Sequence, residues 1–321
     1  MRRLLAVFCL GAAMAMPVRA EAPDDPLSWL GRIASASRQL NYSGTFIYQA
    51  GRQFETSRIA HLVDATGEHE RLEVLDGSPR EVIRSNSAVR CVLPEQKVVI
   101  IDEPGGRRAF PARIPASFAG LAENYRIRKG ETARVAGHDS QLIILDPRDD
   151  LRYGHMLWAE RKSGLLLKAR MVDEGGEIIE QFTFSEVRIG DVDRDSLSPR
   201  YRKNDDWRVV NTRGSAVTQD EAGWVLKDAL PGFSLDSVVR RPLGEGRGEV
   251  VHMLFSDGLA TISVFIEPVE PGQPVGEESP FKAGSINIYK RRVDGHLVTA
   301  LGEVPSRAVR RIGDAIEAVA R

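Results

Sequence analysis

Apolar and polar residues alternate with the two-residue period of a β-strand over much of the chain. In residues 42–49, the aromatic side chains at positions 42, 46 and 48 share one face, and the other face is mostly polar. We expect strands there and over residues 54–63, 70–76, 80–85, 88–93, 97–102, 132–136, 139–146, 153–160, 164–172 and 177–188. Turns rich in Gly, Asp and Ser separate these segments. Many short, closely spaced strands predict a mostly β fold whose antiparallel sheet curls toward a barrel.

Three segments suggest helices instead. Residues 26–40 carry apolar side chains at helical spacing, with Asp25 placed as the N-cap and Pro26 as the first helical residue. The stretch 110–120 is expected to be partly helical. The last helix is expected to be capped by Ser306, and its apolar face should consist of Val309, Ile312, Ile316 and Val319.

A change in composition divides the chain into two domains. Nine of the sixteen residues from 191 to 206 are charged, which indicates a solvated linker between a domain over 21–190 and a smaller α+β domain over 207–321. Within the second domain, an Asp-Gly turn predicts a hairpin over 249–266. The Pro- and Glu-rich segment 267–280 should be an exposed loop. Further strands are expected near 284–291 and 296–302.

The first twenty residues have the layout of a secretory signal peptide. Two arginines precede an apolar run over residues 4–16, and a small-residue site predicts cleavage after Ala20. That run is shorter than the roughly 20 residues needed to span a bilayer, and no later segment is long enough. We reject lipidation at Cys9, because Phe8 precedes it and the apolar run continues beyond it.

Charge and cysteine content change once this leader is removed. The whole chain of 321 residues has 44 basic and 45 acidic residues, and the mature chain keeps 41 basic against 45 acidic, a net charge of −4. This balance argues against nucleic-acid binding, which needs a basic surface. Only Cys91 remains, within an apolar run, so we expect a buried thiol and no internal disulfide.

The sequence contains no recognisable catalytic or metal-binding pattern. The six histidines show no metal-ligand spacing, and no phosphate loop, nucleophile elbow or Cys-x-x-Cys motif is present. We therefore expect a binding protein that is not an enzyme and has no cofactor or metal. Two interpretations stay open for its aromatic faces: a core packed on the 26–40 helix, which is favoured for any single residue, or a cavity for an apolar ligand. The candidate lining residues are Phe46, Tyr48, Met156, Trp158, Leu166 and Phe182.

Several blocks in order along the chain resemble the RseB/MucB family. They are residues 29–30 (WL), 41–48 (NYSGTFIY), 70–72 (ERL), 75–84 (LDGSPREVIR), 152–158 (RYGHMLW), 164–168 (GLLLK), 180–184 (EQFTF), 255–259 (FSDGL), 265–268 (FIEP) and 302–305 (GEVP). The blocks cover nearly the whole mature chain, which makes the resemblance far more specific than any single motif.

The resemblance implies a periplasmic negative regulator of the envelope stress response. Such proteins bind the periplasmic part of a membrane-anchored anti-sigma factor, RseA or MucA, and shield it from the site-1 protease. The larger domain should resemble LolA and LolB, an unclosed antiparallel barrel with helices, and sense a lipid-like ligand such as lipopolysaccharide or an acyl chain. Association with the inner membrane would be peripheral, through the partner.

Within this frame, the second-domain hairpin and the linker are the candidate partner-binding elements. The candidate residues are Phe255, Leu259, Phe265, Arg200 and Arg202. The alternative function is a periplasmic lipid or lipoprotein carrier of the LolA type, which would not need residues 207–321. Homo-oligomerisation, the identity of the ligand and the regulon stay open.

Overall fold

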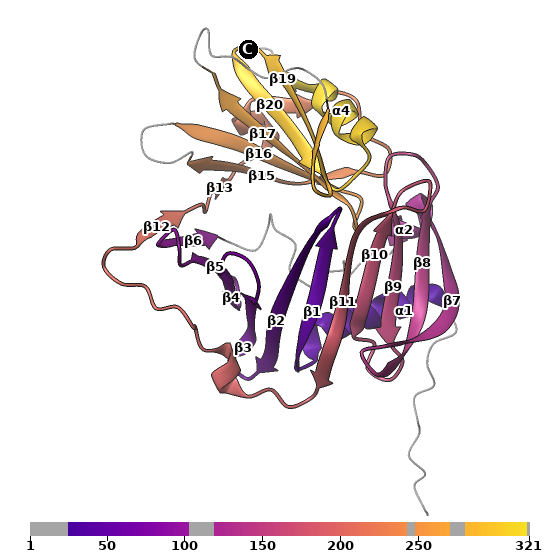
Figure 1. Cartoon of the computed structure of the whole chain (residues 1–321). Helices are drawn as coiled ribbons and strands as arrows, with labels where there is room; N and C mark the ends of the chain where they lie inside the picture. Colours follow the sequence, from indigo (N-terminus) through magenta and orange to yellow (C-terminus); the bar gives the residue numbers. More distant parts are fainter. Residues whose placement is uncertain (1–24, 103–118, 243–247, 270–279, 320–321) are drawn as a thin grey trace, which may run out of the picture.

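The protein consists of a large open β-sheet with a helix on one face and a smaller domain at one end (Figure 1). The computed structural model describes residues 25–102, 119–242, 248–269 and 280–319. The expected signal peptide and most of the expected 110–120 helix and 267–280 loop lie outside the described residues. The predicted fold class, a mostly β protein with an unclosed antiparallel sheet and a smaller α+β domain, is confirmed.

The large sheet has twelve strands in the order β12-β6-β5-β4-β3-β2-β1-β11-β10-β9-β8-β7. In chain order they are β1 (Tyr42–Ala50), β2 (Gln53–Asp64), β3 (Gly67–Val74), β4 (Glu81–Ser85), β5 (Ala88–Leu93), β6 (Val98–Asp102), β7 (Tyr125–Val135), β8 (His138–Pro147), β9 (Gly154–Glu160), β10 (Leu166–Val172), β11 (Ile178–Ile189) and β12 (Arg208–Asn211). Ten of these strands were expected within a few residues. The strand expected over 132–136 begins earlier, as β7, and β12 was not expected.

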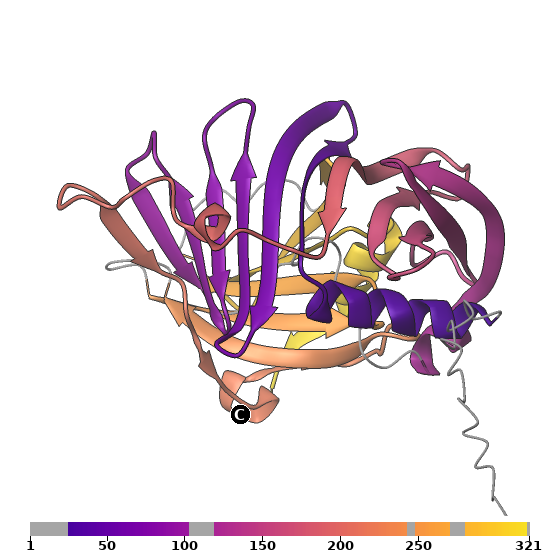
Figure 2. The same ribbon diagram turned by 90° about the horizontal axis from the view of Figure 1, so that it is seen from below.

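Helix α1 (Pro26–Gln39) packs on one face of this sheet. Its start is as predicted: the Asp25 side chain accepts a hydrogen bond from the Ser28 backbone N–H at 2.8 Å, and Pro26 opens the helix. Trp29, Leu30 and other apolar side chains of α1 join the buried cluster of the sheet. Figure 2 shows α1 along the sheet and the strong curl of strands β7–β10. A short helix, α2 (Ala119–Asn124), precedes β7.

Strand pairing defines two faces of the sheet, because directly paired residues of an antiparallel ladder point to the same side. We call the face that carries Phe46 and Phe182 the inner face, since both belong to the cluster that includes α1. We call the opposite face, which carries Ile47 and Gln49, the outer face. The inner face supplies most of the core of the first domain.

The segment between the domains lies against the outer face of the first sheet. A single-turn 3₁₀ helix, η1 (Arg194–Leu197), contacts β2 and β3. Arg194 pairs with Asp64, and Lys97 pairs with Asp206 at 2.6 Å. Residues 208–211 then form β12, which runs parallel to β6. Most side chains from 191 to 206 are exposed, as expected of a linker, but the segment is pinned to the sheet.

The second domain is a seven-stranded sheet in the order β13-β15-β16-β17-β20-β19-β18, with α4 (Ser306–Ala315) on one face. Its strands are β13 (Ser215–Ala216), β15 (Ser234–Pro242), β16 (Glu249–Ser256), β17 (Thr261–Pro268), β18 (Phe281–Ala283), β19 (Ile286–Val293) and β20 (His296–Gly302). A small separate ladder pairs β14 (Trp224–Leu226) with β21 (Ile316–Ala318), and a short helix, α3 (Gln219–Ala222), precedes β14. The predicted β16–β17 hairpin is confirmed.

Two expectations for the last helix are wrong. Ser306 is the first helical residue; Pro305 occupies the N-cap position, and no side chain caps the helix. The helix ends at Ala315, because the chain from Ile316 onward pairs with β14, so Val319 lies outside the helix and is exposed. The helical spacing of the apolar residues could not reveal this strand partner, which lies about ninety residues earlier in the sequence.

Candidate functional site at the domain junction

The turn of the β16–β17 hairpin inserts into the first domain. Leu259, in this turn, packs against the core cluster of the first sheet. In return Leu151, from the loop between β8 and β9, belongs to the core cluster of the second domain. Each domain therefore supplies a leucine that packs with the apolar cluster of the other domain.

A buried ion pair holds this turn in place. Arg152 Nε lies 3.0 Å from Asp257 Oδ2, and both side chains are fully buried. The Arg152 guanidinium also donates to the Pro231 carbonyl at 2.7 Å and to Asp149 Oδ2 at 3.0 Å. The Tyr125 hydroxyl donates to Asp257 Oδ2 at 3.1 Å. The junction is thus a polar network with apolar surroundings, and removing one of its partners should strongly lower the stability of the fold.

Burial dominates the electrostatics of this network. It raises the pKa of Asp257, although the Leu259 and Ala260 backbone N–H groups and Arg152 all favour the carboxylate. Burial raises the pKa of Tyr125 well above its usual range, and the negative charge of Asp257 adds to the effect. Tyr125 therefore remains a neutral hydrogen-bond donor to the carboxylate.

A second contact between the domains brings two carboxyl groups together. The Asn287 amide donates to the Tyr153 hydroxyl at 3.0 Å, and the Ser285 hydroxyl donates to Glu303 Oε1 at 3.4 Å. Glu180 of β11 is half-buried beside Glu303. Burial, then the negative charge of Glu303, raises the pKa of Glu180 to about 7.

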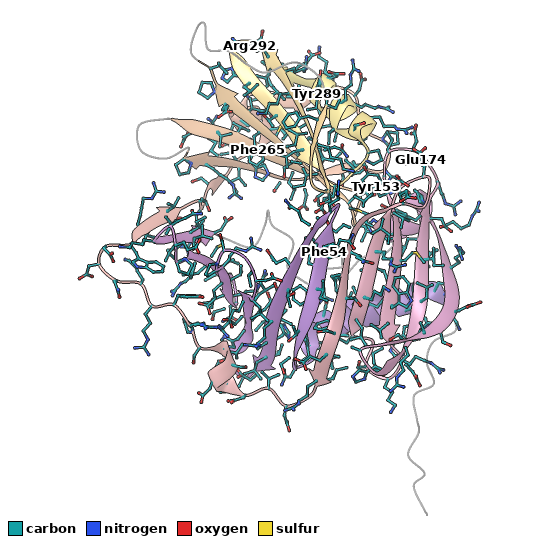
Figure 3. All side chains as sticks on the ribbon, viewed as in Figure 1. Phe54, Tyr153, Glu174, Phe265, Tyr289 and Arg292 are labelled. Atoms are coloured by element: carbon teal, nitrogen blue, oxygen red, sulfur yellow. The ribbon has the colours of Figure 1, made fainter. Side chains whose placement is uncertain are left out.

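The rim of the junction is held by exposed or half-buried pairs. Arg307 of α4 pairs with Asp150 and lies 2.6 Å from Glu174 Oε1. Tyr153 and Glu174 lie at the end of the first sheet that meets the second domain (Figure 3). At the other end of the contact, Arg241 of β15 pairs with Asp102 of β6 at 3.1 Å. Each exposed ion pair of this kind contributes little to stability, so the buried network contributes more to holding the two domains together.

The six residues predicted to line a ligand cavity lie together, but on two faces. Phe46, Trp158, Leu166 and Phe182 are buried in one apolar cluster, with Tyr48 and Met156 packed against it. Phe46 and Phe182 are in edge-to-face contact with ring centroids 6.4 Å apart.

Strand pairing separates this set. Phe182 pairs with Ala169, which pairs with Leu157, so these residues share the inner face. Trp158 and Met156 therefore point to the outer face, where Lys168 and Arg170 lie over the Trp158 ring. The inner residues pack with α1 as a core, which is the first of the two interpretations that the sequence left open.

The candidate partner-binding residues fall into three groups. Phe255 is buried in the core of the second domain, and Leu259 is engaged in the junction. Arg200 is pinned to the first sheet, where it pairs with Glu73. Arg202 is exposed, and Phe265 is half-buried, stacked on His252 at 4.3 Å. Arg200 and Arg202 are thus the exposed members of the set, and Phe265 is partly exposed.

Sequence reasoning missed the central pair of the junction. Arg152 and Asp257 lie within two blocks that carry the family resemblance, but they are about a hundred residues apart, and neither segment shows a pattern that links them. A short turn aspartate normally faces solvent, so its burial depends on the docking of the domains. Missed too was the capping box of α3, Thr218 with Glu221, which the sequence does signal.

Three of the hollows among the described residues have linings that include none of the six predicted ligand residues. A groove of about 410 Å³ lies between η1 and the outer face near Arg58, Arg71 and Arg188. A groove of about 460 Å³ runs along α4, and one of about 270 Å³ lies beside Arg84. No group of His, Cys, Asp or Glu in the described part of the chain could hold a metal ion. No described helix is long and apolar enough to cross a membrane.

Comparison with known proteins agrees with this architecture. The model of the MucB/RseB N-terminal domain matches residues 25–201, and that of the MucB/RseB C-terminal domain matches residues 218–317. The chain belongs to the MucB/RseB family. These are regulatory proteins: the sigma factor AlgU regulatory protein MucB of Pseudomonas aeruginosa is 31% identical over 316 residues, 97% of this chain and 96% of that protein. The sigma-E factor regulatory protein RseB of Haemophilus influenzae is 27% identical, over 88% of each chain.

Solved MucB structures share the whole fold. MucB in complex with MucA(peri) has a TM-score of 0.71 and 30% identity, covering 92% of this chain and 100% of that chain. MucB alone has a TM-score of 0.68 and 28% identity, covering 92% of this chain and 98% of that chain. The agreement in both sequence and fold extends over both domains of this family member.

Proposed function

We propose that this protein binds the periplasmic part of a MucA-like anti-sigma factor and shields it from the site-1 protease. The observation that carries the proposal is the match, over both domains, to a MucB whose solved structure is a complex with MucA(peri). The regulatory names of the relatives support the same assignment. The family is one of regulatory binding proteins, and we infer that this member too acts by binding and has no catalytic activity.

The proposed place of action is the periplasm. The leader-like pattern of residues 1–20 supports export, and the MucA segment in the related complex is its periplasmic part. The protein would then meet the membrane at its periplasmic surface, where a membrane-anchored partner displays the segment to be protected.

The proposed signal is a lipid-like molecule that releases the partner. Such a ligand can act only if it binds the partner-free form more tightly, because linkage between two ligands is reciprocal. A near-complete switch needs about 5 kcal/mol of differential affinity. Burial of an acyl chain, at about 0.8 kcal/mol per methylene, could supply it. The domain junction is suited to couple lipid binding to release of the partner, since the core of the first domain meets the second domain there.

A candidate partner surface is the side of the second sheet opposite α4. Phe265 lies there in register with His252 and Thr299, because these residues pair across β16, β17 and β20. Burial lowers the pKa of His252 to about 4, so this ring is neutral near pH 7 and stacks as an apolar surface. An amphipathic peptide segment could dock against such a face.

The test is recovery of the partner by the tagged mature protein from a solubilised envelope extract. We expect a membrane-anchored anti-sigma factor in the bound fraction, and slower cleavage of its purified periplasmic domain by the site-1 protease when the protein is present. Recovery of acylated cargo alone would reject this function in favour of a lipoprotein carrier.

A further inference from the structure

Two cations lie on the outer face of the first sheet over one tryptophan. Lys168 Nζ is 4.9 Å and the Arg170 guanidinium carbon 5.5 Å from the centroid of the Trp158 ring. Among the residues that the structure describes, neither cation has a carboxylate within ion-pair distance; Arg170 Nε donates to the neutral Gln181 amide at 2.9 Å. Two like charges are therefore held close together without a counter-charge.

The surroundings make these charges costly. Lys168 is half-buried, and burial, followed by the positive charge of Arg170, lowers its pKa. An anion placed at this point would offset both effects, since an opposite charge nearby favours the charged form. Lys168 and Arg170 are thus suited to an anionic partner, and Trp158 supplies a rigid apolar platform beneath them.

Strand pairing shows which side chains lie beside these two cations on the outer face. One row across the outer face runs Trp158, Lys168, Thr183, Ile47 and Thr56. The next row runs Met156, Arg170, Gln181, Gln49 and Phe54. Each row therefore combines a cation, polar amides or hydroxyls, and an apolar side chain toward the β1–β2 hairpin, and neither row contains a carboxylate.

The apolar ends of these rows are open to solvent. Ile47 is 38% and Phe54 65% exposed. Phe54 lies on β2 near the end of the hairpin that approaches the second domain (Figure 3). Beyond these two rows the face becomes mixed in charge, since the next row brings Arg58 and Glu186 together with Thr45. The two rows therefore define a bounded patch, which we call the Trp158 face.

We propose that the Trp158 face docks on the surface of an anionic phospholipid bilayer. Cations with apolar stems and exposed aromatic side chains are the combination that binds the headgroup region, where charge meets phosphates and rings enter the boundary of the acyl chains. The sheet offers these groups side by side on neighbouring strands, which suits a broad planar partner. This docking is independent of anti-sigma binding, so the two proposals can fail separately.

The test is co-sedimentation of the mature protein with vesicles, in the absence of any partner protein. Phosphatidylglycerol vesicles should bind the protein, and phosphatidylcholine vesicles should not. The double variant K168Q/R170Q should bind phosphatidylglycerol about 30-fold more weakly, because each basic residue near an anionic surface contributes roughly 1 kcal/mol. The matched control R310Q/R311Q removes two exposed charges from α4 and should leave binding unchanged.

A second readout separates docking from a structural effect of these charges. In NMR titrations, phosphatidylglycerol vesicles should raise the pKa of Lys168, since the anionic surface stabilises its charged form. Phe54→Ser removes an exposed apolar side chain and should also weaken vesicle binding. Equal binding to both lipids, or equal loss in both double variants, would overturn the proposal. Two other results would also overturn the proposal, if vesicles do not bind. One is a rise in the Lys168 pKa on addition of inorganic phosphate, and the other is binding of an acidic peptide.

Discussion

Replacing Arg152 with methionine would remove the counter-charge of Asp257 while keeping much of the side-chain volume. Both side chains of this pair are fully buried and 3.0 Å apart. Removing one partner of a buried pair costs about 3–5 kcal/mol. Asp257 would keep the N–H groups of Leu259 and Ala260 and the Tyr125 hydroxyl, so we expect a cost near the lower limit, about 3 kcal/mol.

The assay is urea unfolding of the full chain at constant pH. Asp257→Asn should lower stability too, and the double variant R152M/D257N should lose less than the sum of the single losses, because the neutral amide no longer needs the cation. Arg128→Met is the control: its pair with Asp146 is exposed, at 2.8 Å, and should contribute less than about 1 kcal/mol. If Arg152→Met lowers stability no more than Arg128→Met, or if the losses of the two junction variants are additive, the buried pair does not stabilise the junction.

Two further predictions concern the second contact between the domains and the last helix. Burial and the charge of Glu303 raise the pKa of Glu180 to about 7, so the carboxylate form of Glu180 destabilises the folded state. The free energy of unfolding should therefore fall by about 3 kcal/mol as the pH rises from about 4.5 to 7. The variant Glu180→Gln should remove this pH dependence in urea titrations. Gly313→Ala places a methyl group 2.5 Å from the Tyr289 ring, so we expect a loss of about 1–3 kcal/mol in the same assay; unchanged stability would show that α4 can shift freely.

Local patterns in the sequence predicted most of the first domain. Alternation and turn chemistry predicted strands β1–β6, and Asp25 with Pro26 predicted the start of α1, because these signals depend only on neighbouring residues. The parallel pairing of β12 with β6 was missed, since it joins segments about a hundred residues apart. The helical prediction beyond Ala315 was wrong for a similar reason: pairing with β14 overrode the local period.

The candidate site was less predictable than the fold. The sequence identified aromatic residues that do lie close together, but the face of each depends on register across three strands. Phe182 and Trp158 point to opposite faces because Phe182 pairs with Ala169 while Trp158 pairs with Lys168. Likewise, Leu259, a candidate partner-binding residue, packs into the first domain, a contact that only the docking of the two domains creates.

The proposed anti-sigma binding is tested by calorimetric titration of the mature protein with the periplasmic domain of its own MucA-like anti-sigma factor. We expect saturable binding, and we expect the site-1 protease to cleave the bound domain more slowly than the free domain. Absence of binding by a folded protein, together with unchanged cleavage, would contradict the proposal.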